Sequence, residues 1–422
     1  MRKTIKVLSL VVVGVLLLTL GLTGCGQKET GPVTLNALYM KQAGYSEDDI
    51  RQMTDAFMKE NPNIKVNLTF VPYEALHDKI VTSAAAGTGG YDVALVDCIW
   101  TPELAQAGFI KDITGKVEQN IINDIFPGVL SAVKYNDKLY GMPWLNDTKY
   151  LFYNKEILEK AGIKNPPATW EELLADARII KEKGLVKYPI IWSWAQAEAA
   201  VCDYTTLVGG FGGEIIDKDG NPVLNQGAGL EALKFMKKSL DEGLSNPASK
   251  ESLEEDVCRI FSQGEAAFAT NWTYMYNLAN DPKESKVAGK VEIALMPGSA
   301  KVKSASVNGG MGLAILKNTK HEEEALKYLL FMANKDNQKK YAKLALPIYK
   351  SLYSDPEVVK GQEKLVKVAQ EQYQYIVNRP QVAWYPELSQ ALQVELQNAL
   401  LGKKTPEQAL NDVAAKAKEL KK

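Results

Sequence analysis

Apolar and polar residues follow one another in two regular patterns along this chain. In the first, Ile50, Met53 and Phe57 recur at helical spacing behind a capping Ser46, and an Asn-Pro pair ends the segment. In the second, apolar residues take every other position from Lys65 to Phe70, which predicts a strand with one buried face. A helix therefore precedes a strand here, and the same order then repeats.

The alternation of strand and helix extends over most of the sequence. Helical patterns cover 74–87, 101–107, 169–184 and 229–243, and strand patterns cover 91–96 and 186–192. A further amphipathic stretch, 388–422, breaks near Gly402 and restarts at Thr405. This order predicts an α/β fold with a mainly parallel sheet and helices on both of its faces. Because the chain is about three times as long as a typical domain, two α/β units are expected.

The first two dozen residues have the pattern of an export signal. Three basic residues precede an uncharged run from Val7 to Leu20, which is short for a membrane span of ~20 residues. The following Leu22-Thr23-Gly24-Cys25 resembles the lipobox of bacterial lipoproteins, in which the cysteine receives a lipid. We therefore predict a signal peptide at 1–24, lipidation of Cys25 and a tether at 25–32. The alternative is an uncleaved anchor helix with an incidental cysteine.

Charge and composition exclude several classes of protein. Lys and Arg number 50 and Asp and Glu number 51, so no basic surface is expected for nucleic acid. The two histidines, His77 and His321, and the four cysteines leave no Cys/His zinc framework. The three cysteines beyond the lipobox allow at most one disulfide within the chain. No cofactor and no metal are predicted.

Motifs of common enzyme classes are absent from the sequence. There is no GxxxxGK[ST] phosphate loop, no GxSxG nucleophile turn and no HExxH zinc motif. Asp217–Asn221 has calcium-loop residue types, but its glycine is fourth rather than sixth, so we interpret it as a hairpin turn between 214–216 and 222–224. Carboxylates are numerous enough for a glycosidase pair, and an anchored hydrolase therefore stays open as an alternative.

Aromatic and short polar residues coincide in five segments near predicted strand ends. A sugar presents flat C–H faces ringed by hydroxyl groups, so its site needs aromatic faces and directional hydrogen-bonding groups. In open α/β sheets, ligands bind at the carboxyl ends of strands. An aromatic cleft between two units is one hypothesis, and a core that is merely rich in tryptophan is the alternative. The five segments are Asp97–Trp100, Trp144–Asp147, Trp192–Trp194, Asn271–Tyr274 and Trp384–Tyr385.

Several short motifs, taken in order, resemble those of family-one extracellular solute-binding proteins, the maltose-binding-protein type of receptor for bacterial ABC importers. The resemblance runs from residue 33 to the C-terminus, and the order of the motifs is more specific than any single one. The motifs are Gly90-Tyr91-Asp92-Val93 with Ala107-Gly108-Phe109, Leu139–Trp144 before Tyr153-Asn154-Lys155, Pro166–Glu172, Phe261–Phe268 before Trp272, Gly309-Gly310 and Lys403–Leu410.

This resemblance implies an α/β, periplasmic-binding-protein-like fold of two lobes with hinge crossings and an interlobe cleft. The first lobe would comprise 33–145 plus 308–349, and the second 146–307 plus 350–422. The chain would cross the hinge near Trp144–Asp147, Ser304–Asn308 and Tyr349–Ser351. Members of the family bind their ligand in the cleft between the lobes.

The resemblance also implies candidate ligand-binding residues. In sugar-binding relatives an acidic residue ends the strand after the Tyr-Asp-Val motif and contacts hydroxyl groups, and Asp97 stands there. Asp147 matches the acidic residue after the hinge, and Trp272 matches a tryptophan that stacks on a sugar ring. Gly310, from the paired glycines, is the fourth candidate. Some relatives have an aromatic residue next, whereas this chain has Met311, which weakens stacking at that subsite.

Residue type and predicted loop position add five aromatic candidates to the site. Each of them either faces the cleft or packs in a core, and the sequence does not decide between the two positions. They are Tyr39, Trp100, Trp144, Trp194 and Trp384.

Together these observations predict a binding protein rather than an enzyme. We expect a monomeric, lipid-anchored substrate-binding component of an ABC transporter on the outer face of the cell membrane. It would bind a mono- or oligosaccharide and deliver it to membrane permease subunits, with no contact to nucleic acid. One alternative is the same architecture with a non-sugar ligand, such as a polyamine, a peptide or a phosphorylated polyol. The other is the anchored glycoside hydrolase.

Overall fold

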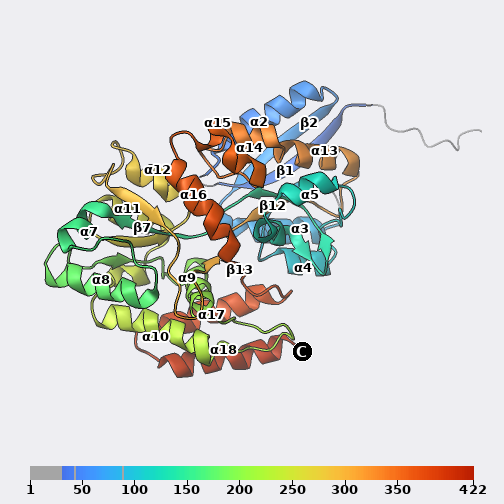
Figure 1. Ribbon diagram of the computed structural model, residues 1–422. Coiled ribbons are helices and arrows are strands. Elements are labelled where there is room, and N and C mark those ends of the chain that lie inside the picture. Colours follow the sequence, from blue (N-terminus) through green and yellow to red (C-terminus); the bar gives the residue numbers. More distant parts are fainter. Residues whose placement is uncertain (1–30, 42–43, 88–89) are drawn as a thin grey trace, which may run out of the picture.

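The computed structural model of the protein describes residues 31–41, 44–87 and 90–422. The predicted signal peptide and Cys25 lie outside these ranges, so lipid anchoring stays a prediction. The described chain folds into two lobes, each built on its own β-sheet (Figure 1). None of the helices in these ranges combines the length and the apolar character that crossing a membrane requires.

The first lobe is built on a five-stranded sheet. Its strands, in spatial order, are β2 (Ile64–Val71), β1 (Val33–Met40), β3 (Val93–Asp97), β12 (Met311–Ile315) and β6 (Met142–Leu145). Strand β1 is parallel to β2 and β3, whereas β12 is antiparallel to β3 and β6. The helices packed on this sheet are α2 (Glu47–Glu60), α3 (Tyr73–Ala85) and α13 (Glu322–Met332).

The second lobe is built on a four-stranded sheet. Its strands, in spatial order, are β10 (Val291–Ala294), β7 (Tyr150–Asn154), β9 (Phe268–Asn271) and β8 (Ile190–Ile191). Strand β9 is antiparallel to β7 and parallel to β8, and β10 is antiparallel to β7. Nearby helices are α7 (Lys155–Ala161), α8 (Trp170–Glu182), α11 (Glu254–Ser262) and α12 (Tyr274–Asn280).

The α/β class and the two-lobe architecture are confirmed, but the prediction of a mainly parallel sheet is wrong. Both sheets mix parallel and antiparallel pairs. In the first lobe, β12 returns from the second lobe and enters between β3 and β6, so it runs against both neighbours. Hydrophobic periodicity indicates that a strand exists but not the direction of the strand beside it.

Two short strands, β11 (Ser306–Val307) and β13 (Ile376–Val377), pair in parallel at the junction of the lobes. The chain passes from the first sheet to the second between β6 and β7, and it returns between β11 and β12. Thr148 and Asn308 form a bridge between these two crossings. The exact lobe boundaries stay predictions.

Helix α9 (Glu198–Gly210) lies against the strand pair at this junction. All of its residues after Glu198 are buried. A Cβ on Gly209 would lie 2.9 Å from Val377 Cγ1 and 3.0 Å from Ala305 Cβ, so this close approach requires a glycine. The helix is therefore fixed tightly against the segments that join the lobes.

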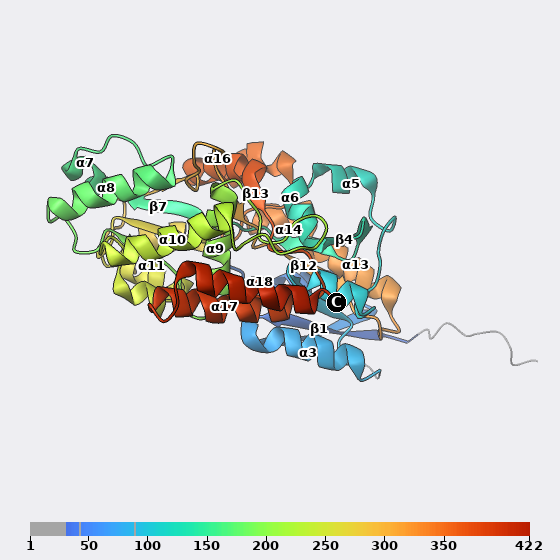
Figure 2. The ribbon, with the colours of Figure 1, turned by 90° about the horizontal axis from the view of Figure 1, so that it is seen from below.

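The C-terminal helices α17 (Tyr385–Leu400) and α18 (Pro406–Leu420) lie side by side and pack on α10 (Gly227–Asp241) (Figure 2). The predicted break and restart of this segment are confirmed, because the Thr405 side chain caps α18 and completes a capping box with Gln408. The predicted helices of the N-terminal part are confirmed as α2, α3 and α4 (Thr101–Gln106).

One predicted strand is shorter than expected, and one predicted turn is confirmed. The segment 186–192 forms only the two-residue strand β8, because Pro189 has no N–H to donate to a ladder; its carbonyl accepts from the backbone N–H groups of Ala267 and Phe268. The turn at Asp217–Asn221 is a hairpin closed by a bridge between Ile216 and Pro222, as predicted.

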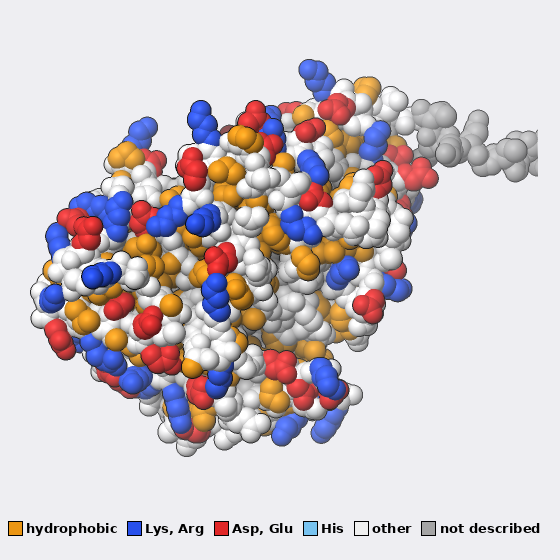
Figure 3. Space-filling model, in the orientation of Figure 1, with side chains coloured by type: hydrophobic (Ala, Val, Ile, Leu, Met, Phe, Trp, Pro, Cys, Tyr) orange, Lys and Arg blue, Asp and Glu red, His pale blue; other side chains and the backbone are white. Residues whose placement is uncertain are grey.

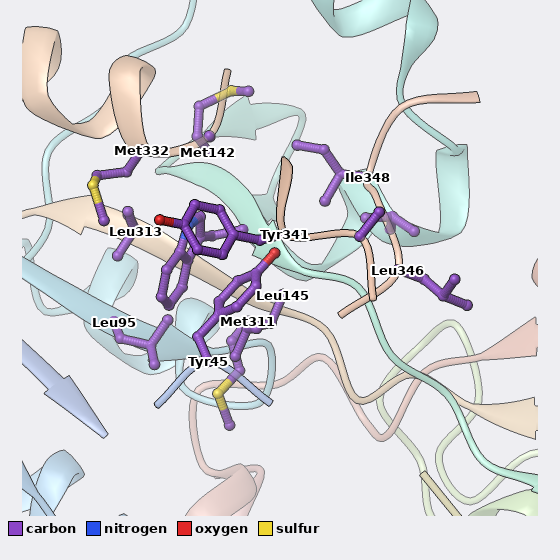
Figure 4. Packing of buried hydrophobic residues seen from close by; sticks show 14 of the residues in the cluster. Tyr45, Leu95, Met142, Leu145, Met311, Leu313, Met332, Tyr341, Leu346 and Ile348 are labelled. Carbon is purple, nitrogen blue, oxygen red and sulfur yellow. The ribbon is translucent and has the colours of Figure 1, made fainter. Parts of the chain in front are cut away.

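The remaining elements are short. They are α5 (Gln119–Asp124), α6 (Pro127–Leu130), η1 (Ser131–Val133), β4 (Lys134–Tyr135), β5 (Lys138–Leu139), η2 (Pro247–Lys250), α14 (Lys335–Lys340), η3 (Lys350–Ser354), α15 (Pro356–Val359), α16 (Glu363–Gln372) and η4 (Tyr373–Tyr375). Figure 4 shows part of the first-lobe core, where Leu95 and Leu313 of the sheet lie near Met332 of α13. The cysteines Cys98, Cys202 and Cys258 are buried and free.

Candidate ligand-binding site between the lobes

A buried arginine links the two lobes. Arg379 follows β13 at the junction, and its side chain is only 2% exposed. Its Nη2 lies 3.3 Å from Asp97 Oδ1, at the end of β3 in the first lobe. Its Nη1 lies 2.8 Å from Glu198 Oε1, at the start of α9 in the second lobe. The guanidinium therefore binds one carboxylate from each lobe. Hydrogen bonds between two charged groups are stronger than those between neutral groups.

Other segments contribute polar groups to the same cluster. Arg379 Nη2 also donates to the carbonyl oxygen of Asn308, 3.1 Å away, and lies 3.3 Å from Cys98 Sγ. The hydroxyl groups of Tyr385 and Ser389, on α17, donate to the Glu198 carboxylate. Arg379 Nε has no partner among the described residues, although it is buried. A buried donor without a hydrogen-bond partner destabilises the folded state, so this atom is a candidate contact for a ligand or water.

Tyr73 covers the first-lobe side of this cluster. Its hydroxyl donates to Asp97 Oδ2 at 3.0 Å, and its ring stacks on Trp100 with centroids 5.2 Å apart. Burial, together with the nearby Asp97 and Glu198 carboxylates, raises the pKa of the Tyr73 phenol. Trp100 is therefore buried beside Tyr73, and the Tyr73 hydroxyl reaches the polar cluster from the first lobe, as the Tyr385 hydroxyl does from α17.

A second buried cation lies in the second lobe. The Lys149 side chain has no exposed surface, and its Nζ lies 2.8 Å from Asp203 Oδ1, 2.8 Å from Ser193 Oγ and 3.4 Å from Glu254 Oε1. Burial lowers the pKa of Lys149, but the two carboxylates more than offset this effect, so the ammonium stays charged. Lys149 Nζ also lies 5.2 Å from the centroid of the Trp272 ring.

Trp272 is half-buried directly after β9. Its backbone N–H donates to Asn271 Oδ1 at 2.8 Å, and its indole Nε1 donates to Glu254 Oε1 at 3.3 Å. On the other side, its six-membered ring lies against Gly309: a Cβ there would lie 2.8 Å from Cη2 and closer still to Cζ3. The predicted stacking residue is thus held in place beside the paired glycines.

Asp147 lies next to Trp272 in the crossing between β6 and β7. Its Oδ1 accepts from Thr148 N at 2.8 Å, from Thr273 N at 3.1 Å and from Thr273 Oγ1 at 2.8 Å. Burial raises the pKa of this carboxyl to about 7, although the bonds from the two threonines lower it in part. The Asp147 carbonyl also accepts from Gly309 N, so Asp147 ties Trp272 to the glycine pair.

Gly310 and Met311 lie on the first-lobe side. Gly310 N donates to Asn308 Oδ1 at 2.9 Å, and its carbonyl accepts from Cys98 N. Met311 is buried in the first-lobe core, close to Leu145 and Tyr45 (Figure 4). Gly310 is therefore near the arginine cluster, whereas Met311 presents little surface to a ligand.

Three predicted aromatic candidates lie inside a core. Tyr39 and Trp144 are 0% exposed; their rings are 5.4 Å apart, and the Tyr39 hydroxyl bonds to that of Tyr328 at 2.9 Å. Trp194 is also 0% exposed and stacks on Trp192 at 4.9 Å. Since these rings already pack against core neighbours, we leave them out of the site proposed below. Trp384 remains a candidate, because it is half-buried at the start of α17.

The structure brings together Asp97, Gly310, Asp147 and Trp272, and it adds residues that the sequence did not single out. Arg379 and Glu198 stand far apart in the sequence, and their pairing across the lobes has no local sequence signal. The molecular surface is hollowed between α17 and the part of the first lobe that carries α3 and α4 (Figure 3). Tyr73 comes from α3, which borders this hollow, and Glu198 accepts hydrogen bonds from Tyr385 and Ser389 of α17, on its other side.

Among the described residues, no three His, Cys, Asp or Glu side chains lie together as a metal site would require. Between the lobes, Asp97 and Glu198 are paired with Arg379, and in the second lobe Asp203 and Glu254 are paired with Lys149. What the cluster can do is hold a solute by charge-assisted hydrogen bonds beside an aromatic ring.

Comparisons with known proteins agree with this geometry. A binding protein of Brucella abortus (strain 2308) is 30% identical over 383 residues, which are 90% of this chain and 91% of that protein. The maltose-bound T. maritima MalE3 structure has a TM-score of 0.83 at 30% identity, over 92% of this chain and 100% of that one. A solute-binding protein of an ABC transporter from Thermotoga lettingae TMO, bound with alpha-D-tagatose, has a TM-score of 0.81 at 27% identity, over 92% of this chain and 99% of that one.

These relatives are binding proteins rather than enzymes, in agreement with the sequence prediction. Residues 43–339 match the family described as bacterial extracellular solute-binding protein. That match covers more than half of the chain, and it includes the second-lobe sheet, the first-lobe sheet apart from β1, and the Trp272 segment. The chain is therefore a member of the bacterial extracellular solute-binding protein family.

Proposed function

We propose that this protein is the substrate-binding component of an ABC importer for a neutral saccharide or polyol. The ligand would lie between the lobes, favour their closed arrangement and be delivered unchanged to membrane permease subunits. A lipid on Cys25 would hold the protein at the outer face of the membrane. Binding can favour closure only by as much as the affinity differs between the open and closed forms.

The observation that supports this proposal most directly is the composition of the interlobe site. Asp97, Glu198 and Arg379 come from both lobes and offer directional hydrogen-bonding groups, and Trp272 lies half-buried at the same junction. Hydroxyl groups of a sugar would exchange hydrogen bonds with the charged groups, and a C–H face would stack on the indole.

The charge of the site argues against an anionic ligand. Each buried cation is already paired with two carboxylates: Arg379 with Asp97 and Glu198, and Lys149 with Asp203 and Glu254. A phosphate group would have to displace those carboxylates and would meet an excess of negative charge. A neutral polyhydroxyl ligand needs no such exchange. The maltose and tagatose bound to the two relatives above are neutral sugars.

Such a site can supply the free energy that micromolar binding of a saccharide requires. Micromolar binding corresponds to about 8 kcal/mol. Stacking on an aromatic ring contributes about 1 kcal/mol beyond area burial, and each hydrogen bond to a charged group contributes about 2 kcal/mol. A single stacked ring with several such bonds therefore reaches the micromolar range.

A thermal-shift screen followed by titration calorimetry tests the proposal. Maltose, tagatose and mannitol represent neutral ligands, glucose 6-phosphate represents an anion and spermidine a cation. A cognate neutral ligand should raise the melting temperature, since ligand at 100 times its Kd stabilises the folded state by about 2.7 kcal/mol. Stabilisation by the phosphate or the polyamine alone would contradict the proposal.

The hydrolase alternative needs a separate experiment. Maltotriose incubated overnight with the protein should be recovered intact by anion-exchange chromatography. The release of shorter sugars would show that the protein cleaves its ligand and would overturn the receptor assignment. The Asp147→Asn variant, prepared in parallel, would then show whether a carboxyl near Trp272 takes part in the cleavage.

A further inference from the structure

The indole of Trp272 is held on three sides by the protein. Its N–H edge donates to Glu254 Oε1, its six-membered ring lies against Gly309, and Lys149 Nζ lies over the ring. We infer that Lys149 and Glu254 are positioning residues that fix the orientation of Trp272 for ligand stacking. The inference rests on the proposed function, because it gives these two residues a role in binding through Trp272.

Lys149 acts from beneath the site and not at its surface. Its side chain is completely buried, and its Nζ is already bound to Asp203, Ser193 and Glu254. A ligand therefore cannot reach the ammonium without breaking those bonds. What the ammonium does contact from this position is the aromatic ring, and a desolvated cation near a tryptophan ring is strongly attracted to it.

Glu254 connects the lysine to the indole. The same oxygen, Oε1, lies 3.4 Å from Lys149 Nζ and accepts the Trp272 N–H at 3.3 Å. The Glu254 carbonyl in turn accepts from Asn271 Nδ2 at 2.8 Å, and Asn271 Oδ1 accepts the backbone N–H of Trp272. One residue at the start of α11 thus fixes both the side chain and the backbone of the tryptophan.

Asp203 keeps the lysine in place. It accepts from Lys149 at 2.8 Å, from Ser193 at 3.3 Å and from Thr270 at 3.4 Å, so α9 and β9 are both tied to the ammonium. Because Lys149 Nζ lies over one face of the indole, a sugar ring can stack only on the surface of Trp272 that the ammonium and Gly309 leave free.

A second trio of the same residue types offers a matched control. Lys364 Nζ lies 5.6 Å from the centroid of the Tyr153 ring and pairs with Glu292. The Lys364 side chain is 44% exposed, and the trio involves β7, β10 and α16 rather than the interlobe site. Changes there alter a Lys–Glu–aromatic contact without touching Trp272.

The test uses the full chain labelled with 5-fluorotryptophan. The fluorine resonance of Trp272 is assigned by its loss in Trp272→Phe and is followed without ligand. Glu254→Leu should move that resonance by more than its linewidth and weaken binding of the saccharide found by calorimetry about fivefold. Glu254→Gln, which keeps an acceptor for the indole N–H, should restore most of both properties, and Lys364→Met should change neither.

The lysine needs a variant that still folds. Lys149→Met alone leaves Asp203 buried and unpaired, which is strongly destabilising, so it is combined with Asp203→Asn. This double variant should also shift the Trp272 resonance and weaken binding. If the resonance stays in place in both Glu254→Leu and the double variant, the inference is wrong. If the wild-type protein binds no saccharide or polyol, the proposed function fails instead, and the resonance still reports the positioning.

Discussion

At the scale of single residues, the site depends on which buried charges have partners. Arg379 and Lys149 are each held by two carboxylates, and a buried cation without such partners would strongly destabilise the folded state. Trp272 lies beside Lys149 and Gly309, and Asp147 accepts hydrogen bonds from Thr273 and Gly309.

Trp272→Ala should weaken saccharide binding at least tenfold, because it removes the stacking surface; this is a loss of about 1.4 kcal/mol or more. Thermal stability should change little, since the side chain is only half-buried. Calorimetry and a melting curve measure the two effects. Phe109→Ala, which removes a half-buried ring that contacts Lys317 on the first lobe, is the control and should bind normally. Unchanged affinity for Trp272→Ala would remove this residue from the site.

Asp147 should make the stability of the protein depend on pH. Its pKa is about 7 in the folded protein and about 4 in the unfolded chain, so the folded state binds the proton more tightly. The contribution of this group to stability should therefore decrease as pH rises from 4 to 7 and stay constant above 7.

Asp147→Asn removes this titration, so urea unfolding at pH 5 and pH 8 should give a smaller difference in the variant than in the wild type. The variant should also bind saccharide more weakly at pH 8, where the wild-type carboxyl is charged. Equal affinities would leave Asp147 with a structural role at the hinge. Equal pH dependence of unfolding would show that Asp147 does not titrate near neutrality.

Gly309→Ala should displace the Trp272 ring, because the new Cβ would overlap its six-membered ring. We expect saccharide affinity to fall about tenfold, with a loss of stability of about 1–3 kcal/mol from overpacking. Calorimetry and urea unfolding measure these effects. Gly31→Ala is a suitable control, since a Cβ there would meet no atom within 4 Å. Normal affinity in Gly309→Ala would mean that the indole is free to move away.

Part of the candidate site at this scale could be predicted from the sequence. Asp97 and Trp272 were predicted because a strand ends near each of them and the family motifs mark those strand ends. Tyr39 and Trp144 were candidates by residue type and predicted loop position, yet an aromatic ring suits a core as well as a cleft, and only burial separates the two. Arg379 was missed because its partners lie far away in sequence, at Asp97 and Glu198.

At the scale of elements, α9 is the helix on which the two buried cations converge. Glu198 in its first turn binds Arg379, and Asp203 one turn later binds Lys149. Its close contact with β11 and β13 places both carboxylates at the junction of the lobes. Changes in α9 should therefore affect the stability of the whole junction.

Glu198→Gln should destabilise the protein by about 2 kcal/mol, because Arg379 loses one charged partner and an amide cannot accept from Arg379, Tyr385 and Ser389 as a carboxylate does. The midpoint of urea unfolding measures this change. Glu242→Gln, at the partly exposed pair with Arg178, is the matched control and should have an effect below about 1 kcal/mol. Equal effects of the two changes would show that burial adds nothing to the Glu198 pair.

Helices were predicted more reliably than strand pairing. The apolar spacing of α2 and α10 and the Thr-Pro start of α18 define these helices locally. The direction of β12 depends on where the chain comes from, and the segment 186–192 was limited by one proline. Local patterns do not show from which lobe the chain enters a strand, so the mixed sheets could not be predicted.

At the scale of the whole molecule, the Asp97–Arg379–Glu198 cluster joins the lobes. Lysine at position 379 keeps one charge but lacks the planar fork that reaches two carboxylates at once. Arg379→Lys should therefore shift the protein toward an open arrangement. Small-angle X-ray scattering should give a larger radius of gyration for the ligand-free variant than for the wild type.

Saccharide affinity of Arg379→Lys should fall at least tenfold, since the arginine contributes hydrogen bonds in the closed form. Lys149 and its partners are untouched, so the variant should fold, as a normal circular dichroism spectrum would verify. An unchanged radius of gyration would show that this cluster does not contribute to closure.

The position of β12 also determines when the protein can fold. This interior strand pairs with β3 and β6, which precede it by most of the second lobe. A polypeptide that emerges N-terminus first leaves the edge of β3 open until its later half arrives, and unpaired edges promote aggregation. The interleaved connectivity predicts slow folding, and it suits a chain that is translocated before its tertiary structure forms.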